Sequence, residues 1–159
     1  MVPFESLGRL RVPAHPEEKP VRDFLIRSDV NIVEIAARLQ ETTEVATEVG
    51  VPKGAVGFYT SKVPLDEPMW DQLAQYSGLT AYLYWFHLAE ILRVGAAAPT
   101  FKNLVPTGTQ IAFRTNLADG LRTVRGRIDW QKGHSLGRVP LDRPWVWEPR
   151  TVFLVSKPS

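Results

Sequence analysis

The histidines and carboxylates of this 159-residue chain are side chains that could bind a metal ion or act in catalysis. The histidines are His15, His87 and His134, and the absence of cysteine excludes disulfides, thiolate metal sites and a cysteine nucleophile. His87 and Glu90 are three residues apart in an apolar stretch, a spacing that could share a metal ion on a helix. Because no second ligand pair has a suitable spacing, a histidine hydrogen-bonded to its helical neighbour is favoured. We therefore expect neither a metal site nor a cofactor.

Residues 133–137 read GHSLG, which fits G-x-S-x-G and resembles the nucleophile elbow of α/β-hydrolase lipases and esterases. The resemblance implies that Ser135 is a nucleophile on a strained turn between a strand and a helix. In that family an acid and then a histidine follow the serine. Asp142 and Glu148 do follow Ser135, but no histidine does, and the proline-containing segment after it cannot form the required helix. A glycine-flanked surface loop is therefore expected, and a small hydrolase is only a third candidate function.

A β-hairpin is predicted from Gly108 to Lys132, because Asp119-Gly120 is a strong two-residue turn signal. This turn would pair Ala118 with Leu121 and thereby set the register of both strands. The face of the hairpin that is expected to lie on the core would carry three opposed pairs, Ile111 with Ile128, Phe113 with Gly126, and Thr115 with Val124.

The other face of this predicted hairpin gathers three arginines, with Arg114 opposite Arg125 and Arg127 diagonal to it. Like charges that face each other on a sheet are destabilising, so the cluster indicates an anionic partner. Arginine suits bidentate contacts with carboxylate or phosphate. The partner could be an acidic residue of this chain, an acidic neighbouring protein or a phosphate. Alternatively, the arginines extend into water and their stems cover the sheet.

Charge is distributed unevenly along the chain. Residues 1–100 hold 9 Lys+Arg and 13 Asp+Glu, whereas residues 101–159 hold 10 and 4. Such asymmetry is expected if the basic part binds nucleic acid. It is also expected if copies of the protein stack with the basic face of one on the acidic face of the next. The remaining possibility is a solvated surface whose two sections simply differ.

The segment Thr43–Lys62, TEVATEVGVPKGAVGFYTSK, allows two interpretations. It resembles the helix-turn-helix of bacterial repressors of the TetR type, with Ala46 as the small residue and Gly50 as the turn glycine. The resemblance implies a DNA-binding regulator that uses residues 43–62 and contacts DNA through three side chains. These would be Lys53, Tyr59 and Lys62.

Two strands joined near Pro52–Gly54 are the favoured interpretation of this segment. The supposed reading helix would contain Gly54 and Gly57, each of which costs roughly 1 kcal/mol relative to alanine. Threonine and valine supply most of TTEVATEV, and both favour strands. The strand-like C-terminal third also disagrees with an all-helical repressor.

The remaining segments complete the predicted organisation. The N-terminal segment is proline-rich and should lie as an extended arm across its own body or a neighbouring subunit. In the helical region, Asp66 should cap the first helix, and the second helix, Leu79–Gly95, should be mostly buried. The predicted segments are an arm at 1–20, a strand at 21–27, an ambiguous helix or strand at 31–40, helices at 66–98 and a buried strand at 151–157.

Together these features predict a single α+β domain, residues 1–159, with a mostly antiparallel sheet packed on the 66–98 helical region. The lack of a catalytic set favours a non-enzymatic subunit of a larger oligomeric particle, such as a phage tail, neck or capsid-decoration component. Its partners would be copies of itself or other proteins, with Trp145 and Trp147 docking on them, and nucleic acid as a less favoured partner. No signal peptide or membrane span is recognised, so we expect a soluble protein, cytoplasmic or within a virion.

Overall fold

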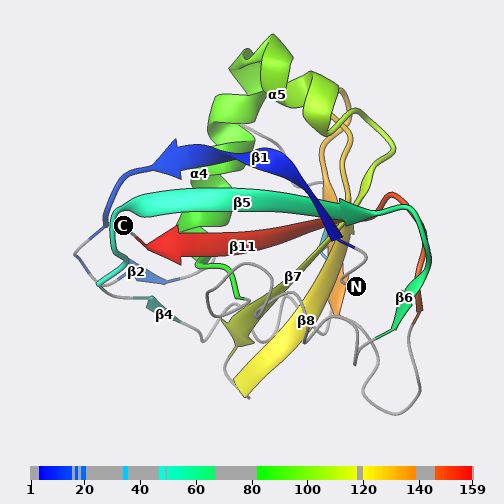
Figure 1. Ribbon diagram of the computed structural model, residues 1–159. Coiled ribbons are helices and arrows are strands. Elements are labelled where there is room, and N and C mark those ends of the chain that lie inside the picture. Colours follow the sequence, from blue (N-terminus) through cyan, green and yellow to red (C-terminus); the bar gives the residue numbers. More distant parts are fainter. Residues whose placement is uncertain are drawn as a thin grey trace.

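A seven-stranded mixed sheet lies at the centre of the protein, which is described from a computed structural model (Figure 1). The strand order is β1-β5-β11-β7-β8-β9-β3, and four of the six neighbouring pairs are antiparallel. The structure describes residues 4–15, 17, 19–20, 34–35, 47–48, 50–66, 82–117, 120–138 and 146–158. The strands of this sheet are β1 (Phe4–Val12), β3 (Glu34–Ile35), β5 (Gly54–Ser61), β7 (Gln110–Leu117), β8 (Gly120–Arg127), β9 (Ser135–Arg138) and β11 (Val152–Pro158).

Two helices and two short ribbons complete the described part of the chain. One ribbon pairs β2 with β4, and the other pairs β6 with β10. A mostly antiparallel sheet with helices packed on it confirms the predicted α+β class. These elements are β2 (Lys19–Pro20), β4 (Thr47–Glu48), β6 (Leu65–Asp66), α4 (Trp85–Ala97), α5 (Pro99–Leu104) and β10 (Val146–Trp147).

The N-terminal segment is an edge strand of the main sheet rather than a separate arm. Strand β1 runs antiparallel to β5, from Phe4 opposite Ser61 to Val12 opposite Gly54. Phe4 and Val12 are buried, so the strand contributes to the hydrophobic core. Of the two positions expected for residues 1–20, residues 4–12 therefore take the one on the chain's own body. The register shifts near Gly8, whose φ of 125° a side chain would rarely adopt.

The segment 43–62 contains strands where it is described. Strand β5 replaces the reading helix of the helix-turn-helix interpretation, so the structural premise of that interpretation is wrong. All eight residues of β5 are buried, because β1 and β11 pair with its two edges and side chains cover both of its faces. Gly57 fits this site because a Cβ there would lie 2.9 Å from Cε of Lys157 and from the Tyr59 ring. A close approach in a strand thus explains a glycine that would weaken a helix.

The predicted hairpin exists, but its register is shifted by two residues. Leu117 pairs with Gly120, whereas Ala118 was expected to pair with Leu121. A shift of two preserves which face each side chain occupies, so the apolar face points to the core as predicted. The opposed pairs differ from those expected, and they are now Ile111 with Gly126, Phe113 with Val124, Thr115 with Arg122, Arg114 with Thr123, and Ala112 with Arg125.

The shifted register has a physical reason on each face of the hairpin. It places Arg114 opposite Thr123, so that the two arginines expected to oppose each other no longer do so. It also places Gly126 opposite Ile111 and Leu136, in a site that is closed to a larger residue. A Cβ on Gly126 would lie 2.6 Å from the carbonyl oxygen of Ser135.

The helical region differs from its prediction at both ends. Asp66 was expected to cap the first helix, but it lies in strand β6, and residues 67–81 are outside the described residues. Helix α4 begins at Trp85 and is largely buried, as predicted. The six-residue helix α5 follows it and was not predicted. Gly95 permits this turn, because a Cβ there would lie 2.4 Å from the ring of Phe101 in α5.

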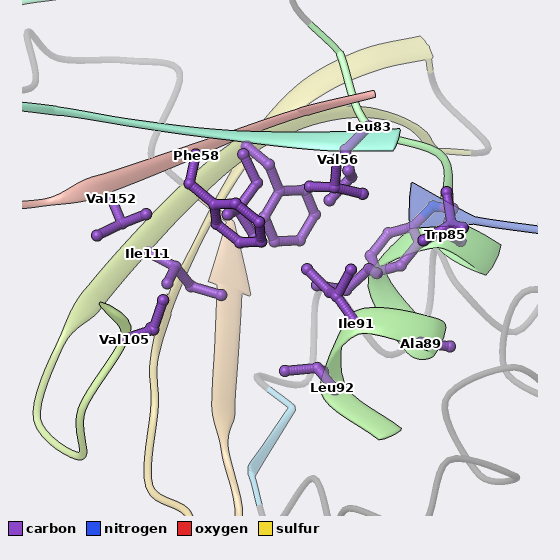
Figure 2. Packing of buried hydrophobic residues seen from close by; sticks show 14 of the residues in the cluster. Val56, Phe58, Leu83, Trp85, Ala89, Ile91, Leu92, Val105, Ile111 and Val152 are labelled. Atoms are coloured by element: carbon purple, nitrogen blue, oxygen red, sulfur yellow. The ribbon is translucent and has the colours of Figure 1, made fainter. Parts of the chain in front are cut away.

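The main core lies between α4 and one face of the sheet (Figure 2). Figure 1 shows α4 crossing behind β1, β5 and β11. In Figure 2, Ile91 and Trp85 of α4 approach Val56 and Phe58 of β5, which identifies the helix as the cover of this face. A fully buried side chain of this size contributes about 1.5–3 kcal/mol through burial.

The C-terminal strand was predicted with its burial, and β11 confirms that prediction. It pairs with β5 on one edge and in parallel with β7 on the other. The predicted strand at 21–27 lies outside the described residues. Of the ambiguous segment 31–40, the structure describes strand β3, which pairs in parallel with β9.

Two neighbouring substitutions on β1 test its place in the sheet. Val12 is 4% exposed, whereas Arg11 points into solvent from the same strand. We expect Val12→Asp to reduce the free energy of unfolding by at least about 2 kcal/mol, because it buries an unpaired charge. The control Arg11→Asp should change it by less than about 0.5 kcal/mol. Urea unfolding followed by circular dichroism measures both, and equal stability of the two variants would contradict this role of β1.

Candidate functional site

The predicted arginine cluster lies on the face of the sheet opposite α4, which we call the basic face and define as Arg114, Arg125 and Arg127. Arg125 and Arg127 are exposed two residues apart on β8, and Arg114 is half-buried on β7. Residues i and i+2 of a strand lie on the same side, so both β8 arginines point the same way. The structure therefore brings the three predicted side chains to one face, with Arg114 and Arg125 diagonal rather than opposite.

The neighbours of these arginines leave space around their side chains. Arg125 lies between Ala112 of β7 and Gly137 of β9 in the sheet, and both are small. Arg127 lies between Gln110 and Ser135, and its Nη1 donates a hydrogen bond to the carbonyl oxygen of Gly108 at 2.9 Å.

The arginines of this region also interact within the chain. Arg114 and Arg125 each have an intrachain interaction, as does Arg122 on the opposite side of β8. These arginines are therefore not free of contacts with their own chain. The exposed side chains of Arg125 and Arg127 retain surface for a second contact.

A small apolar cluster covers the rest of this sheet face and includes Trp147. The ring of Trp147 is fully buried and meets Phe153 edge-on at a centroid distance of 6.0 Å. Leu65 opposite Trp147 in the β6–β10 ribbon is buried in the same cluster. The expectation that Trp147 docks on a partner is therefore wrong, since its side chain holds the ribbon on the sheet. Trp145 lies outside the described residues.

The three residues proposed for DNA contact do not form one surface. Tyr59 is 3% exposed in the middle of β5, with Nζ of Lys157 5.0 Å from the centroid of its ring. Lys53 and Lys62 are exposed just beyond the opposite ends of this eight-residue strand. At about 3.3 Å per residue they are on the order of 30 Å apart along the strand.

The GHSLG segment has no nucleophile elbow and is not a loop throughout. Ser135 begins strand β9, which pairs with β8, so a turn into a helix does not follow it. His134 is fully buried and its Nδ1 accepts a hydrogen bond from the backbone N–H of Asp129 at 3.0 Å. Its ring meets that of Trp130 edge-on, with centroids 4.8 Å apart. These contacts assign His134 to the packing of a turn and leave Ser135 without an adjacent base among the described residues.

Burial has an electrostatic consequence for His134. Because the charged imidazole would lose its hydration, burial lowers its pKa to about 4, while the nearby Asp129 carboxylate acts in the opposite direction. The proton of the neutral ring lies on Nε2, since Nδ1 is an acceptor. Nε2 has no hydrogen-bond partner among the described residues.

A second polar cluster, which the sequence did not predict, surrounds the N-terminus of α4. Tyr84 precedes this helix and provides no side-chain cap. Instead the carboxylate of Glu48 in β4 accepts hydrogen bonds from the backbone N–H groups of Trp85 and Phe86, both at 2.8 Å. Burial raises the pKa of Glu48, while these two hydrogen bonds and the charge of His15 lower it. A distant segment thus supplies the cap that the helix lacks.

The same cluster brings a serine and a histidine together. His87 Nε2 lies 3.0 Å from the carbonyl oxygen of Pro52, which can only accept, so Nε2 carries the proton. His87 Nδ1 therefore accepts from the hydroxyl of Ser156 at 2.9 Å, and this hydroxyl accepts from the N–H of Tyr84 at 3.0 Å. Burial lowers the pKa of His87.

This serine–histidine pair has the proximity that nucleophilic catalysis needs but not the access. Ser156 is 3% exposed and His87 is fully buried, so a substrate cannot reach either side chain in this arrangement. The pair instead joins β11, α4 and the turn at Pro52. The expected hydrogen bond between His87 and Glu90 is not formed, since both ring nitrogens of His87 have other partners and Glu90 pairs with Arg93 at 2.8 Å. For the same reason the His87 ring has no nitrogen left for a metal ion in this arrangement.

The phenols of Tyr82 and Tyr84 extend the network toward the surface. Their hydroxyls are 3.0 Å apart, and both side chains are half-buried. Burial is the largest cause that raises the pKa of Tyr84 to about 12, followed by its hydrogen bond to Tyr82. The phenol of Tyr84 therefore stays neutral at physiological pH, which suits a structural network.

No further assignment of function comes from metal-ligand geometry, from membrane-spanning helices or from similarity to known proteins. Among the described residues, no group of three His, Asp or Glu side chains could hold a metal ion. None of the described helices has the length and apolarity that crossing a membrane requires. No protein-family model, no curated protein and no solved structure matches the chain.

The buried His134 predicts how stability depends on pH. Its pKa is lower in the folded protein than the usual value near 6.5, so the unfolded chain binds more protons between those values. The free energy of unfolding should therefore be fully retained above about pH 6.5 and should fall by about 1–2 kcal/mol at about pH 5. Urea unfolding at a series of pH values measures this change.

The variant His134→Asn isolates this contribution, since its amide oxygen can accept from the Asp129 N–H but does not titrate. It should reduce the slope of stability against pH, whatever its effect on stability at pH 7.5. The slope should not vanish, because burial also lowers the pKa of the His87 that remains. The same slope in parent and variant would exclude His134 as its source.

Proposed function

We propose that this protein is a non-catalytic assembly subunit, a component of a larger particle such as a phage tail, neck or capsid-decoration layer. It would associate with copies of itself or with other proteins of the particle. The observation that carries the proposal is the basic face, where Arg125 and Arg127 are exposed two residues apart on a strand that is paired on both edges. Nucleic acid is an alternative partner that the experiment below separates from protein.

The position of the basic face on the sheet favours contact with another protein. Arg125 and Arg127 project from β8, whose neighbours β7 and β9 hold it on both sides. Their positions are therefore fixed by the sheet ladder, and less conformational freedom is lost on binding than from a mobile loop. Arginine on such a surface can form bidentate hydrogen bonds to carboxylates.

The distribution of charge along the chain supports copies of the protein as the acidic partner. The basic face belongs to residues 101–159, which hold 10 Lys+Arg against 4 Asp+Glu, whereas residues 1–100 carry an excess of carboxylates. A basic part on one copy can therefore meet an acidic part on the next. A head-to-tail contact of this type joins two different surfaces and can repeat into a ring or a filament.

The proposal predicts that Arg125→Glu combined with Arg127→Glu impairs assembly and leaves the fold intact. Both side chains are exposed, so the variant should keep the circular dichroism spectrum of the parent. Sedimentation velocity should show larger species of the parent at about 0.1 M salt, and smaller species of the variant. High salt should mimic the variant, since the Debye length decreases from about 10 Å at 0.1 M to about 3 Å at 1 M.

The matched control is Lys53→Glu combined with Lys132→Glu, which changes the net charge equally at exposed positions in turns. This control should assemble like the parent. Equal assembly of the parent and the Arg125→Glu, Arg127→Glu variant at low salt would overturn the role of the basic face. A shift of duplex DNA by the parent, lost in this variant but kept in the control, would assign the face to nucleic acid instead.

A further inference from the structure

A strained turn lies between β10 and β11. The backbone N–H of Thr151 donates to the carbonyl oxygen of Glu148 at 3.3 Å, which closes a four-residue turn. Pro149 occupies its second position, and Arg150 occupies its third with a φ of 71°. A negative φ at proline followed by a positive φ defines a type II turn, whose third position normally holds glycine or asparagine.

Arginine is an exception at this backbone geometry. Among the described residues, Arg150 is the single non-glycine residue with positive φ. The other left-handed positions hold glycine, which accepts them without strain. Strain that a glycine would relieve indicates that the side chain itself is used. The positions occupied by glycine are Gly8, Gly50, Gly108 and Gly133.

The side chains of Glu148 and Arg150 both extend into solvent from this turn. Among the described residues, neither Glu148 nor Arg150 is part of an ion pair of the kind that joins Arg93 to Glu90. The turn thus presents one negative and one positive charge, two residues apart, that do not neutralise each other.

Exposed apolar side chains accompany these charges. The backbone N–H of Arg150 donates to the carbonyl oxygen of Ser61 at 2.8 Å, which continues the antiparallel course of the β6–β10 ribbon toward β5. Val146 on this ribbon is 61% exposed, and Val63 on the facing segment is 46% exposed. They are two of the four exposed large hydrophobic residues in the described chain. The buried ring of Trp147 fixes the ribbon beneath them.

We infer that this turn is a two-fold contact between two copies of the chain, in which Arg150 of each copy pairs with Glu148 of the other. A surface that carries both charges is self-complementary, because a two-fold axis brings each cation to the anion of the second copy. Val146 and Val63 supply the apolar surface beside these pairs. The contact goes beyond the basic face but rests on the same proposal that copies of the chain associate.

Two single variants and their mixture test this contact. Glu148→Arg makes the turn wholly positive, and Arg150→Glu makes it wholly negative. In sedimentation velocity each variant alone should associate at least about tenfold more weakly than the parent, because like charges then meet at the axis. An equimolar mixture should recover association to within about threefold of the parent, because each turn then meets its complement. The control Arg11→Glu reverses an exposed charge on β1 and should change nothing.

The variant Arg150→Gly separates strain from contact. Glycine should lower the equilibrium constant of unfolding roughly threefold to tenfold by relieving the left-handed strain, offset in part by the freer unfolded chain. It should simultaneously weaken association, since the cation is lost. A residue retained for structure alone would not produce these opposite changes.

The outcomes distinguish this contact from the proposed function. If the parent associates, and Glu148→Arg and Arg150→Glu each associate equally well, the two-fold contact is overturned while the basic face remains. The contact is also overturned if the mixture fails to recover association that both variants lose. A parent that stays monomeric at both low and high salt overturns this contact together with self-assembly through the basic face.

Discussion

Burial of β5 on both faces and both edges is the constraint on which the rest of the structure depends. An eight-residue strand buried throughout must satisfy all of its backbone groups in the sheet, which requires β1 on one edge and β11 on the other. It must also be covered on each side. Helix α4 covers the face that carries Val56 and Phe58, and the ribbon that carries Trp147 covers Tyr59 on the other. The N-terminal segment therefore forms the edge strand beside β5, and the C-terminal segment lies inside the sheet between β5 and β7.

The sequence predicts faces better than registers and boundaries. Alternation placed the arginines and the apolar residues of the β7–β8 hairpin on their correct sides, and a register shift of two residues left both sides unchanged. The turn signal at Asp119-Gly120 could not reveal that Gly126 had to lie between Ile111 and Leu136, because β9 joins this sheet from a separate segment. The α+β class and the burial of β11 follow from local patterns. The start of α4 does not follow from local patterns, because Glu48 caps it from a distant strand.

The candidate site shows the same division between local and distant information. The basic face was predictable because its members belong to one hairpin. The contact of His87 with Ser156 was not, since 69 residues separate them and no motif links them. Trp147 was misplaced for a related reason. A tryptophan in a proline-rich segment has the same local sequence whether it lies on the surface or on Phe153, and the pairing of β10 with β6 decides between the two.

Histidine and serine side chains, which could act in catalysis, contribute to packing where this fold buries them. His87, Ser156 and His134 have hydrogen-bond geometries that could serve catalysis, yet each is closed to substrate. Their bonds satisfy polar groups that the junctions between α4, β11 and the turns would otherwise leave unpaired. The charges on the surface include arginines held by the sheet and an arginine held in a strained turn. Fixed surface charges of this kind can recognise another surface by complementarity.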